Sequence, residues 1–380
     1  MKVVKCMLMV ALCLCLCGCQ LLSSGSHIYV AEHKPASTGG NGQGMSVSNY
    51  AQLYDALVGL VSSGAQQQTI SVDGYDKQRL ASDLKKVVTE VQTCDPIAAF
   101  AVTEIQCTLG TASGTDAVSV QILYSRDRTE LSQIVAVADN EEARGVIEQS
   151  LNACDTGVLL YIADYTSVDF VQIVEDYGLA HPEYVMEQPQ VAVGVYPERG
   201  KSRVVELKYA YHTSRDSLKN MQNQVSPVFR SAVLYVSGDA AAEEKYSQLY
   251  SFLVERYDYT IASSTTPTYS LLRHGVGDSK AFAAVYASMC RQAGLDCRVV
   301  SGNRGEKNWY WNIVRLDGIY YHIDLLSLED PGVFSVHSDE TMRTSGYMWD
   351  FDAYPVCGYD PVAECPVGIT VNFFFLIMKK

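Results

Sequence analysis

Hydrophobic and polar residues alternate with a helical period in two stretches near the start of the chain's body, residues 50–61 and 77–91. The segment TISVDGY between them is typical of a strand, and two further strands are expected to end in VSVQILYSRD. Asp95-Pro96 predicts the end of the second helix, because proline lacks an amide N–H and clashes with the preceding turn. Residues 49–135 are therefore expected to form an αβαββ module.

The same order recurs roughly 90 residues later, over residues 136–230. Helices are expected at 141–153 and 168–177, with the strand VLLYIADY between them, a break at His181-Pro182 and a last strand VVELKYAY. Self-similarity at a fixed period suggests a duplicated module, with chance likeness between amphipathic elements as the alternative. Neither module has His, Cys and carboxylates at metal-ligand spacing, so both are expected to serve as scaffold or recognition modules.

The third region, residues 240–365, has a different pattern. EEKYSQLYSFLVERYDY predicts a helix with one largely apolar face, and GDSKAFAAVYASMC predicts a second helix, followed by the strand CRVVSG. NWYWNIVRLDGIYYHIDLL predicts two strands around Asp317-Gly318, a dipeptide suited to a type I′ hairpin turn. The whole chain is therefore expected to belong to the α+β class.

The first residues of the chain predict where the protein works. Lys2 and Lys5 precede an apolar run that is too short to span a bilayer, which is the form of a signal peptide over residues 1–18. The run ends in LCGC, which resembles the bacterial lipobox and implies that a diacylglycerol is attached to the thiol of Cys19. An ordinary signal peptide is the alternative. Residues 19–48 are rich in Ser, Gly and Asn, as expected for a flexible tether, so the body is predicted to be anchored to the cell membrane on its extracytoplasmic face.

Composition narrows the possible partners. The formal net charge of -14 argues against nucleic acid or anionic lipid as a partner. Of the 12 cysteines, five lie up to and including Cys19, and the seven that follow are odd in number and include no CxxC, so neither a disulfide framework nor a metal or other cofactor is expected. Cys357 and Cys365 are close enough in sequence to close a small loop. The apolar residues 366–380 are expected to form a tail or an edge strand, being too few to span a membrane.

The region from about 243 to 357 resembles the transglutaminase-like superfamily, which has a papain-like fold. The resemblance rests on YDY after the first helix, GVGDSKAF before and within the second, NWYWN on the hairpin and the later ID, in the family's order and spacing. It implies a Cys–His–Asp triad at the positions of Ser279, Trp309 and Asp324. Only the aspartate is retained.

These replacements predict lost catalysis. Serine is a far weaker acid than cysteine and needs an adjacent base, whereas the indole of Trp309 has only a donor N–H. His322 shares a face with Asp324, but it is expected opposite Ile313, a further step from the place that an imidazole should occupy. For Ser279 the structural alternative to catalysis is helix capping, for Trp309 it is core packing, and for Asp324 it is a hydrogen bond to the indole or to backbone.

Three functions remain open. The first is a surface lipoprotein whose inactive domain binds a peptide, cell-wall or protein partner in a cleft. The second is an active hydrolase or acyltransferase that uses Ser279 with an unidentified base, and the third is a purely structural assembly module. The residues expected to line the cleft beside the triad positions are Asp278, Trp311, Asn312 and His322.

Overall fold

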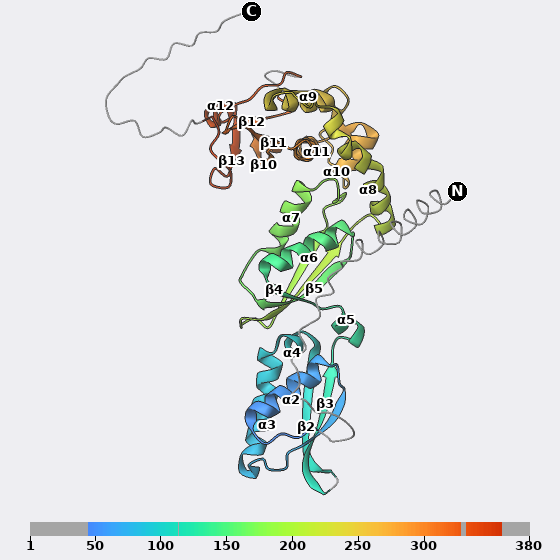
Figure 1. The fold of residues 1–380 in the computed structure, drawn as a ribbon, viewed down its shortest axis with the longest axis vertical. Coiled ribbons are helices and arrows are strands. Elements are labelled where there is room, and N and C mark those ends of the chain that lie inside the picture. Colours follow the sequence, from blue (N-terminus) through green and yellow to red (C-terminus); the bar gives the residue numbers. More distant parts are fainter. Residues whose placement is uncertain (1–44, 113, 328–331, 359–380) are drawn as a thin grey trace, which may run out of the picture. The chain divides into compact units, whose positions relative to one another are not determined.

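The computed structural model describes residues 45–112, 114–327 and 332–358. Its described residues divide into two compact units, one within residues 1–138 and 161–163 and the other within residues 139–160 and 164–380 (Figure 1). The signal segment, Cys19, most of the tether, Cys365 and the apolar tail lie outside the described residues. What the sequence predicts for them therefore stays a prediction.

In the first unit, helices pack against a three-stranded antiparallel sheet in the order β1-β3-β2 (Figure 1). Asp76 caps α3 by accepting a hydrogen bond from the amide N–H of Gln78. The helix then buries Leu80, Leu84 and Val87, whose spacing of four and three residues places them on one face. Residues 45–139 hold α2 (Tyr50–Ser62), β1 (Gln67–Ser71), α3 (Lys77–Cys94), α4 (Pro96–Ala101), β2 (Val102–Ala112), β3 (Thr115–Tyr124), α5 (Arg128–Ser132) and β4 (Val135–Asp139).

The next module is built around a four-stranded sheet in the order β4-β5-β7-β6. At Gly157, at the start of β5, an added Cβ would lie 2.3 Å from the carbonyl oxygen of Leu207 on β7, so only glycine fits there. Residues 140–230 hold α6 (Asn140–Asn152), β5 (Gly157–Asp164), α7 (Phe170–Ala180), β6 (Gln190–Tyr196), β7 (Arg203–Ala210) and α8 (Arg215–Arg230).

The two modules share their strand order as well as their element order. In the first, β3 lies between β1 and β2, and in the second β7 lies between β5 and β6. The predicted sequence of helices and strands is thus present in each. The duplication itself stays a prediction, since a shared topology does not establish common descent.

The C-terminal part of the second unit surrounds one buried helix, α11. Small residues such as Ala283, Ala284 and Ala287 allow close packing on all sides, and α11 contacts β10, β11 and α9 (Figure 1). Its sheet has the strand order β12-β11-β10-β13. Residues 231–358 hold η1 (Ala232–Leu234), α9 (Ala242–Val254), β8 (Asp258–Tyr259), α10 (Pro267–Tyr269), η2 (Ser270–His274), β9 (Val276–Gly277), α11 (Ser279–Gln292), β10 (Cys297–Arg304), β11 (Lys307–Leu316), β12 (Ile319–Ile323), α12 (Asp339–Thr344) and β13 (Tyr347–Trp349).

The expected α+β class is confirmed, and several of the described helices were not predicted, among them α4 and α8. Pro96 ends α3 as expected but also opens α4, since proline suits the first position of a helix and Asp95 caps it. Helix α8 is not evident from the sequence because it is polar and contains Pro227. Its buried residues, among them Leu218 and Val225, nevertheless follow helical spacing.

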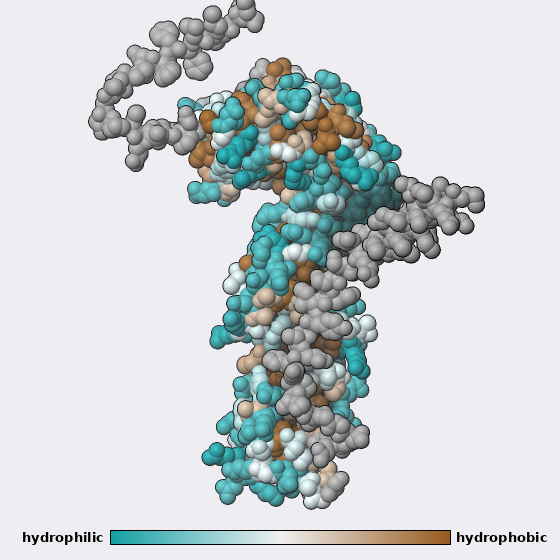
Figure 2. All heavy atoms as spheres, viewed as in Figure 1, coloured by the Kyte–Doolittle hydropathy of each residue, from teal (hydrophilic) through white to brown (hydrophobic). Residues whose placement is uncertain are grey.

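The surface is predominantly polar on the face drawn in Figure 2, where hydrophobic residues occur in separate patches. Some large apolar side chains are well exposed, among them Leu234 at 80% and Ile261 at 71%. Single exposed apolar side chains are normal on soluble proteins.

Candidate functional site

The first turn of α11 holds Ser279 at the junction between this helix and the hairpin. Asp278 caps the helix by accepting a hydrogen bond from the N–H of Ala281 at 2.9 Å, so the helix begins at Ser279 as the sequence predicts. Ser279 is only 6% exposed, and its Oγ accepts a hydrogen bond from the N–H of Tyr310 at 3.3 Å. The hydroxyl is therefore fixed against β11, beside Trp309.

The hairpin of β11 and β12 has the predicted register. Asp317 and Gly318 both have positive φ, at 49° and 88°, as a type I′ turn requires, and Ile313 pairs with His322. Asp324 follows directly after β12. Its Oδ2 accepts a hydrogen bond from the indole Nε1–H of Trp309 at 2.8 Å, so these two side chains meet diagonally across the strands.

Asp324 is surrounded by donors. Besides the indole, its Oδ2 accepts hydrogen bonds from the hydroxyl of Tyr347 at 2.6 Å and from Nη1 of Arg304 at 3.2 Å. Its Oδ1 accepts one from the N–H of Leu326 at 2.9 Å. Burial, together with the charge of Asp324, raises the pKa of Tyr347, so this hydroxyl keeps its proton and donates. The carboxylate is thus saturated without a histidine.

Arg304 also holds the indole in place. Its guanidinium carbon lies 3.9 Å from the ring centroid of Trp309, within the range of a cation–π contact, and the ring of Tyr259 lies 5.7 Å away. Neither Arg304 nor Tyr347 was predicted to contribute. Both lie on strands outside the quoted motifs, and only the three-dimensional sheet brings them to Asp324.

The side chains at positions 279 and 309 differ from the Cys and His that the family resemblance implies. A general base needs a lone pair at the position of Trp309, which the indole nitrogen does not offer. The only hydrogen bond of Ser279 Oγ within the described chain is the one from Tyr310, which uses the oxygen as acceptor and does not activate it. Asp278 places a carboxylate at the helix N-terminus, where it opposes a developing oxyanion.

Three of the residues expected to line the cleft lie instead in the core. Trp311, Asn312 and His322 are each 0% exposed and line neither of the two cavities described below. Asn312 donates through Nδ2 to the carbonyl oxygen of Ala283 at 2.9 Å, which ties β11 to α11. A ligand in the cleft therefore does not reach these three side chains, which corrects the expectation for them. Asp278 does line a cavity.

His322 belongs to a buried hydrogen-bonded chain. Trp311 donates through Nε1–H to His322 Nδ1 at 2.9 Å, which fixes the remaining imidazole proton on Nε2, 2.8 Å from Oδ1 of Asp339. Burial lowers the pKa of His322, against the opposing effect of Asp339. The imidazole thus orients structural groups, and within the described chain its hydrogen bonds go to Trp311 and Asp339 and not to Ser279.

The same geometry bears on metal binding. His322, Asp339 and Cys357 place ligand-type atoms within 4.8 Å of one another. A metal would need the lone pair of Nε2, which carries the proton because Nδ1 accepts from Trp311. Burial raises the pKa of Cys357 to about 12, which disfavours the thiolate that metals bind. These groups fit a hydrogen-bonded cluster better than a metal site.

A groove with a cavity volume of about 690 Å³ opens beside Ser279 and Trp309. Asp324 does not line it and faces a second cavity of about 300 Å³. The groove combines aromatic rings, hydroxyls and charges of both signs. The lining residues are Glu187, Gln188, His212, Tyr259, Ile261, Ser263, Ser264, Thr265, Pro267, Asp278, Ser279, Lys280, Glu306, Lys307, Asn308, Trp309 and Tyr310.

The preceding module contributes to this groove and is bonded to α11. Glu183, 7% exposed, accepts hydrogen bonds from Ser288 Oγ at 2.8 Å and Arg291 Nη2 at 3.2 Å. Glu187, 2% exposed, accepts hydrogen bonds at Oε1 from His212 Nδ1, 3.0 Å away, and at Oε2 from a backbone N–H. The sequence did not single out these residues, since their role depends on contacts roughly 25 to 110 positions apart.

Comparison with known proteins finds a family match in the C-terminal half of the chain. Residues 231–325 match the model of the transglutaminase-like superfamily. No curated protein matches the chain. Within the described residues, no helix combines the length and apolarity that a membrane span requires.

Three solved structures show weak likeness. A TGase is 12% identical at a TM-score of 0.25, with 67% of this chain and 72% of that chain covered. A candidate cysteine protease from Cytophaga hutchinsonii is 11% identical at a TM-score of 0.24, with 37% of this chain and 63% of that chain covered. A candidate protease from Parabacteroides distasonis is 10% identical at a TM-score of 0.22, with 70% of this chain and 45% of that chain covered. This chain therefore spans less than two thirds of the length of each of the two protease structures. Scores this low carry no argument about mechanism.

Proposed function

Residues 231–325 are a transglutaminase-like domain, and from that premise we propose that the domain binds a ligand in the groove beside Ser279 without cleaving it. The observation that carries the proposal is the hydrogen bond from Trp309 to Asp324. An indole donor stands where the family's base would need an acceptor. The domain keeps the architecture of the site and lacks its proton transfer.

The groove supports a binding role more than a purely structural one. Its volume of about 690 Å³ lies within the usual range of ligand pockets, whereas a filled cleft would suit an assembly module. Hydroxyls of Ser263, Ser264 and Thr265 and the amide of Asn308 offer both donors and acceptors. Such a lining suits an extended peptide, and the proposed ligand is a peptide, a cell-wall peptide or a segment of a partner protein.

The location follows from the start of the chain. The LCGC sequence supports lipidation of Cys19, and the Ser- and Gly-rich residues that follow support a tether. We therefore place the groove on the extracytoplasmic face of the cell membrane, where peptidoglycan peptides and surface proteins are available.

Binding can be tested by isothermal titration calorimetry, in which soluble muropeptides or extended synthetic peptides are added to the protein that keeps its predicted tether but carries no lipid. Thr265→Trp places a bulky side chain at an exposed groove position and should abolish binding. Glu255→Trp is the matched control, because Glu255 is exposed but lines neither cavity. Equal binding by both variants would rule out the groove as the site.

One observation favours a second candidate function, hydrolysis or acyl transfer by Ser279. His212 lines the same groove, and the buried carboxylate of Glu187 holds its Nδ1, an arrangement that orients an imidazole. A base from the preceding module would be the unidentified partner. In that case wild-type turnover of a peptide amide or ester would be lost in both Ser279→Ala and His212→Ala.

A further inference from the structure

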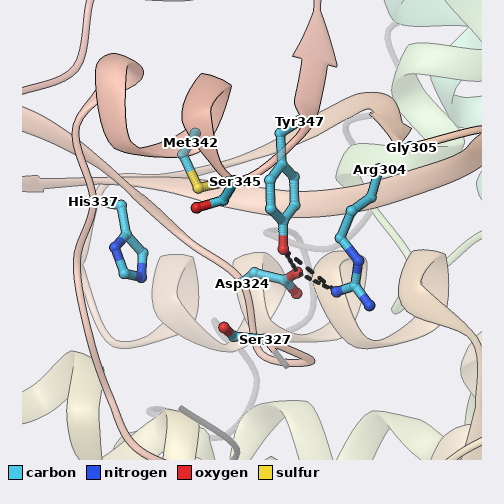
Figure 3. Close-up of a pocket in the computed structure, with 8 residues that line it drawn as sticks. All are labelled: Arg304, Gly305, Asp324, Ser327, His337, Met342, Ser345 and Tyr347. Atoms are coloured by element: carbon cyan, nitrogen blue, oxygen red, sulfur yellow. Dashed lines mark hydrogen bonds and ion pairs between the residues drawn. The ribbon is translucent and has the colours of Figure 1, made fainter. Parts of the chain in front are cut away.

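The second cavity, on the Asp324 side of Trp309, is a separate candidate site. It has a volume of about 300 Å³, at the small end of ligand pockets. Figure 3 shows Arg304 and His337 on opposite sides of it, with Met342 and Ser345 between them. The lining residues are Arg304, Gly305, Asp324, Ser327, His337, Met342, Ser345 and Tyr347.

Asp324 does not depend on Arg304 for its hydrogen bonds. The indole of Trp309, the hydroxyl of Tyr347 and the N–H of Leu326 are three neutral donors to the same carboxylate. All hydrogen bonds of Arg304 within the described chain come from one nitrogen, Nη1, which donates to Asp324 Oδ2, the carbonyl of Leu326 and Tyr347 Oη. Nε and Nη2 keep their donors for another acceptor.

The remaining walls offer further donors and one apolar surface. His337 shares a hydrogen bond with Ser335 through Nε2, which leaves Nδ1 uncommitted, and the hydroxyl of Ser345 has no partner within the described chain. The side chain of Met342 and the ring of Tyr347 form the apolar part of the wall. Donors on two sides of a small space suit an acceptor with two oxygens.

Charge limits the choice of ligand. Arg304 is the fixed positive charge of the lining and Asp324 the fixed negative one, at 3.2 Å from each other. The Asp324 carboxylate repels both negative charges of a dianion such as phosphate, whereas it repels only the single charge of a monoanion. We propose that this cavity binds a small monocarboxylate, either a free acid or the C-terminal carboxylate of a short peptide, through Arg304 with support from His337 and Ser345.

The proposal is independent of the groove, so its failure and that of the proposed function are distinguishable. The probes are acetate, propionate, acetyl-alanyl-alanine with a free carboxylate, and the same dipeptide as its C-terminal amide. Binding is followed by calorimetry and by tryptophan fluorescence, since Arg304 lies over Trp309. The free dipeptide or the small acids should bind, and the amide should bind at least tenfold more weakly than the free dipeptide. Binding of the dipeptide without the small acids identifies a peptide terminus, and the reverse identifies a free acid.

Two variants separate the site from a fold defect. Arg304→Gln should lose at least tenfold in affinity but also disturbs the Asp324 network. Ser345→Phe fills the cavity from a half-buried position and leaves every hydrogen bond of Asp324 in place, so it should abolish binding in a folded protein. Arg343→Gln, at an exposed position of α12, and Thr265→Trp, in the groove, should bind the small acids as the wild type does. Equal affinity for acid and amide, unchanged binding by Ser345→Phe, or no binding of any probe at millimolar concentration overturns the proposal.

Discussion

Combining Ser279→Cys with Trp309→His should create a reactive thiol at the start of α11. In Ser279→Cys alone, a thiol with a pKa near 8.5 is only about 3% thiolate at pH 7, because no imidazole is paired with it. In Ser279→Cys with Trp309→His, the new imidazole lies between the thiol and Asp324. Imidazole-paired thiols have pKa values of roughly 3.5 to 7.5. A value near 7 makes about half of the thiol ionised, roughly a fifteenfold gain in thiolate.

Two neighbours should moderate this gain. The carboxylate of Asp278 at the helix N-terminus opposes a thiolate, and the guanidinium of Arg304, 3.2 Å from Asp324, opposes an imidazolium. Adding Arg304→Gln to the double variant should therefore increase the rate further. Replacing the indole of Trp309 by an imidazole also opens space in the core and removes the cation–π contact with Arg304. These two effects should lower the free energy of unfolding by roughly 2–4 kcal/mol.

The assay is iodoacetamide alkylation at position 279, followed by peptide mass spectrometry because other cysteines, such as the exposed Cys94, also react. Circular dichroism establishes that each variant is folded at the assay temperature. The double variant should react about ten times faster than the single variant at pH 7, and adding Asp324→Asn should remove most of that gain. A folded double variant that reacts at the rate of the single variant would show that Trp309 is not what keeps the site unreactive.

Three further outcomes are expected. Burial holds the pKa of His322 below its usual 6.5, so the unfolded state takes up a proton that the folded state resists. The free energy of unfolding should therefore fall as the pH drops below about 6.5. Urea melts of the wild type and of His322→Gln test this, and identical pH slopes of the two proteins would contradict it. Asp324→Ala leaves buried donors of Trp309, Tyr347 and Arg304 without their acceptor and should cost roughly 3–5 kcal/mol in the same melts, while a loss under 1 kcal/mol would mean that the network is dispensable. Metabolic labelling with a fatty acid should mark the wild type and not Cys19→Ala, and equal labelling would exclude the lipid anchor.

The local parts of the site could be predicted from sequence because short-range rules determine them. Asp317-Gly318 fixes a two-residue turn, the turn fixes the register, and the register brings Trp309 diagonally across from Asp324. Asp278 marks the start of α11 for a similar reason, since it caps the first turn.

The other contributions could not be predicted because they depend on tertiary packing. Arg304 reaches Asp324 across the sheet, and Tyr347 does so from β13, which pairs with β10 although β11, β12 and α12 separate the two strands in the sequence. Glu183 joins the preceding module to α11 over roughly a hundred residues. The sequence-based expectation that His322 lines the cleft was wrong. It rested on the strand face that His322 shares with Asp324, and that face does not show how deeply α12 and the following chain bury the imidazole.

Whether the transglutaminase-like domain is inactive, as proposed, can be measured on the wild-type protein itself. Incubation of the full body with a fluorophosphonate and with iodoacetamide, followed by mass spectrometry of the peptide that contains Ser279, should find no modification of that residue by either reagent. Stoichiometric labelling of Ser279 by the fluorophosphonate, together with turnover of an amide or ester that Ser279→Ala abolishes, would contradict the claim and establish a working serine site.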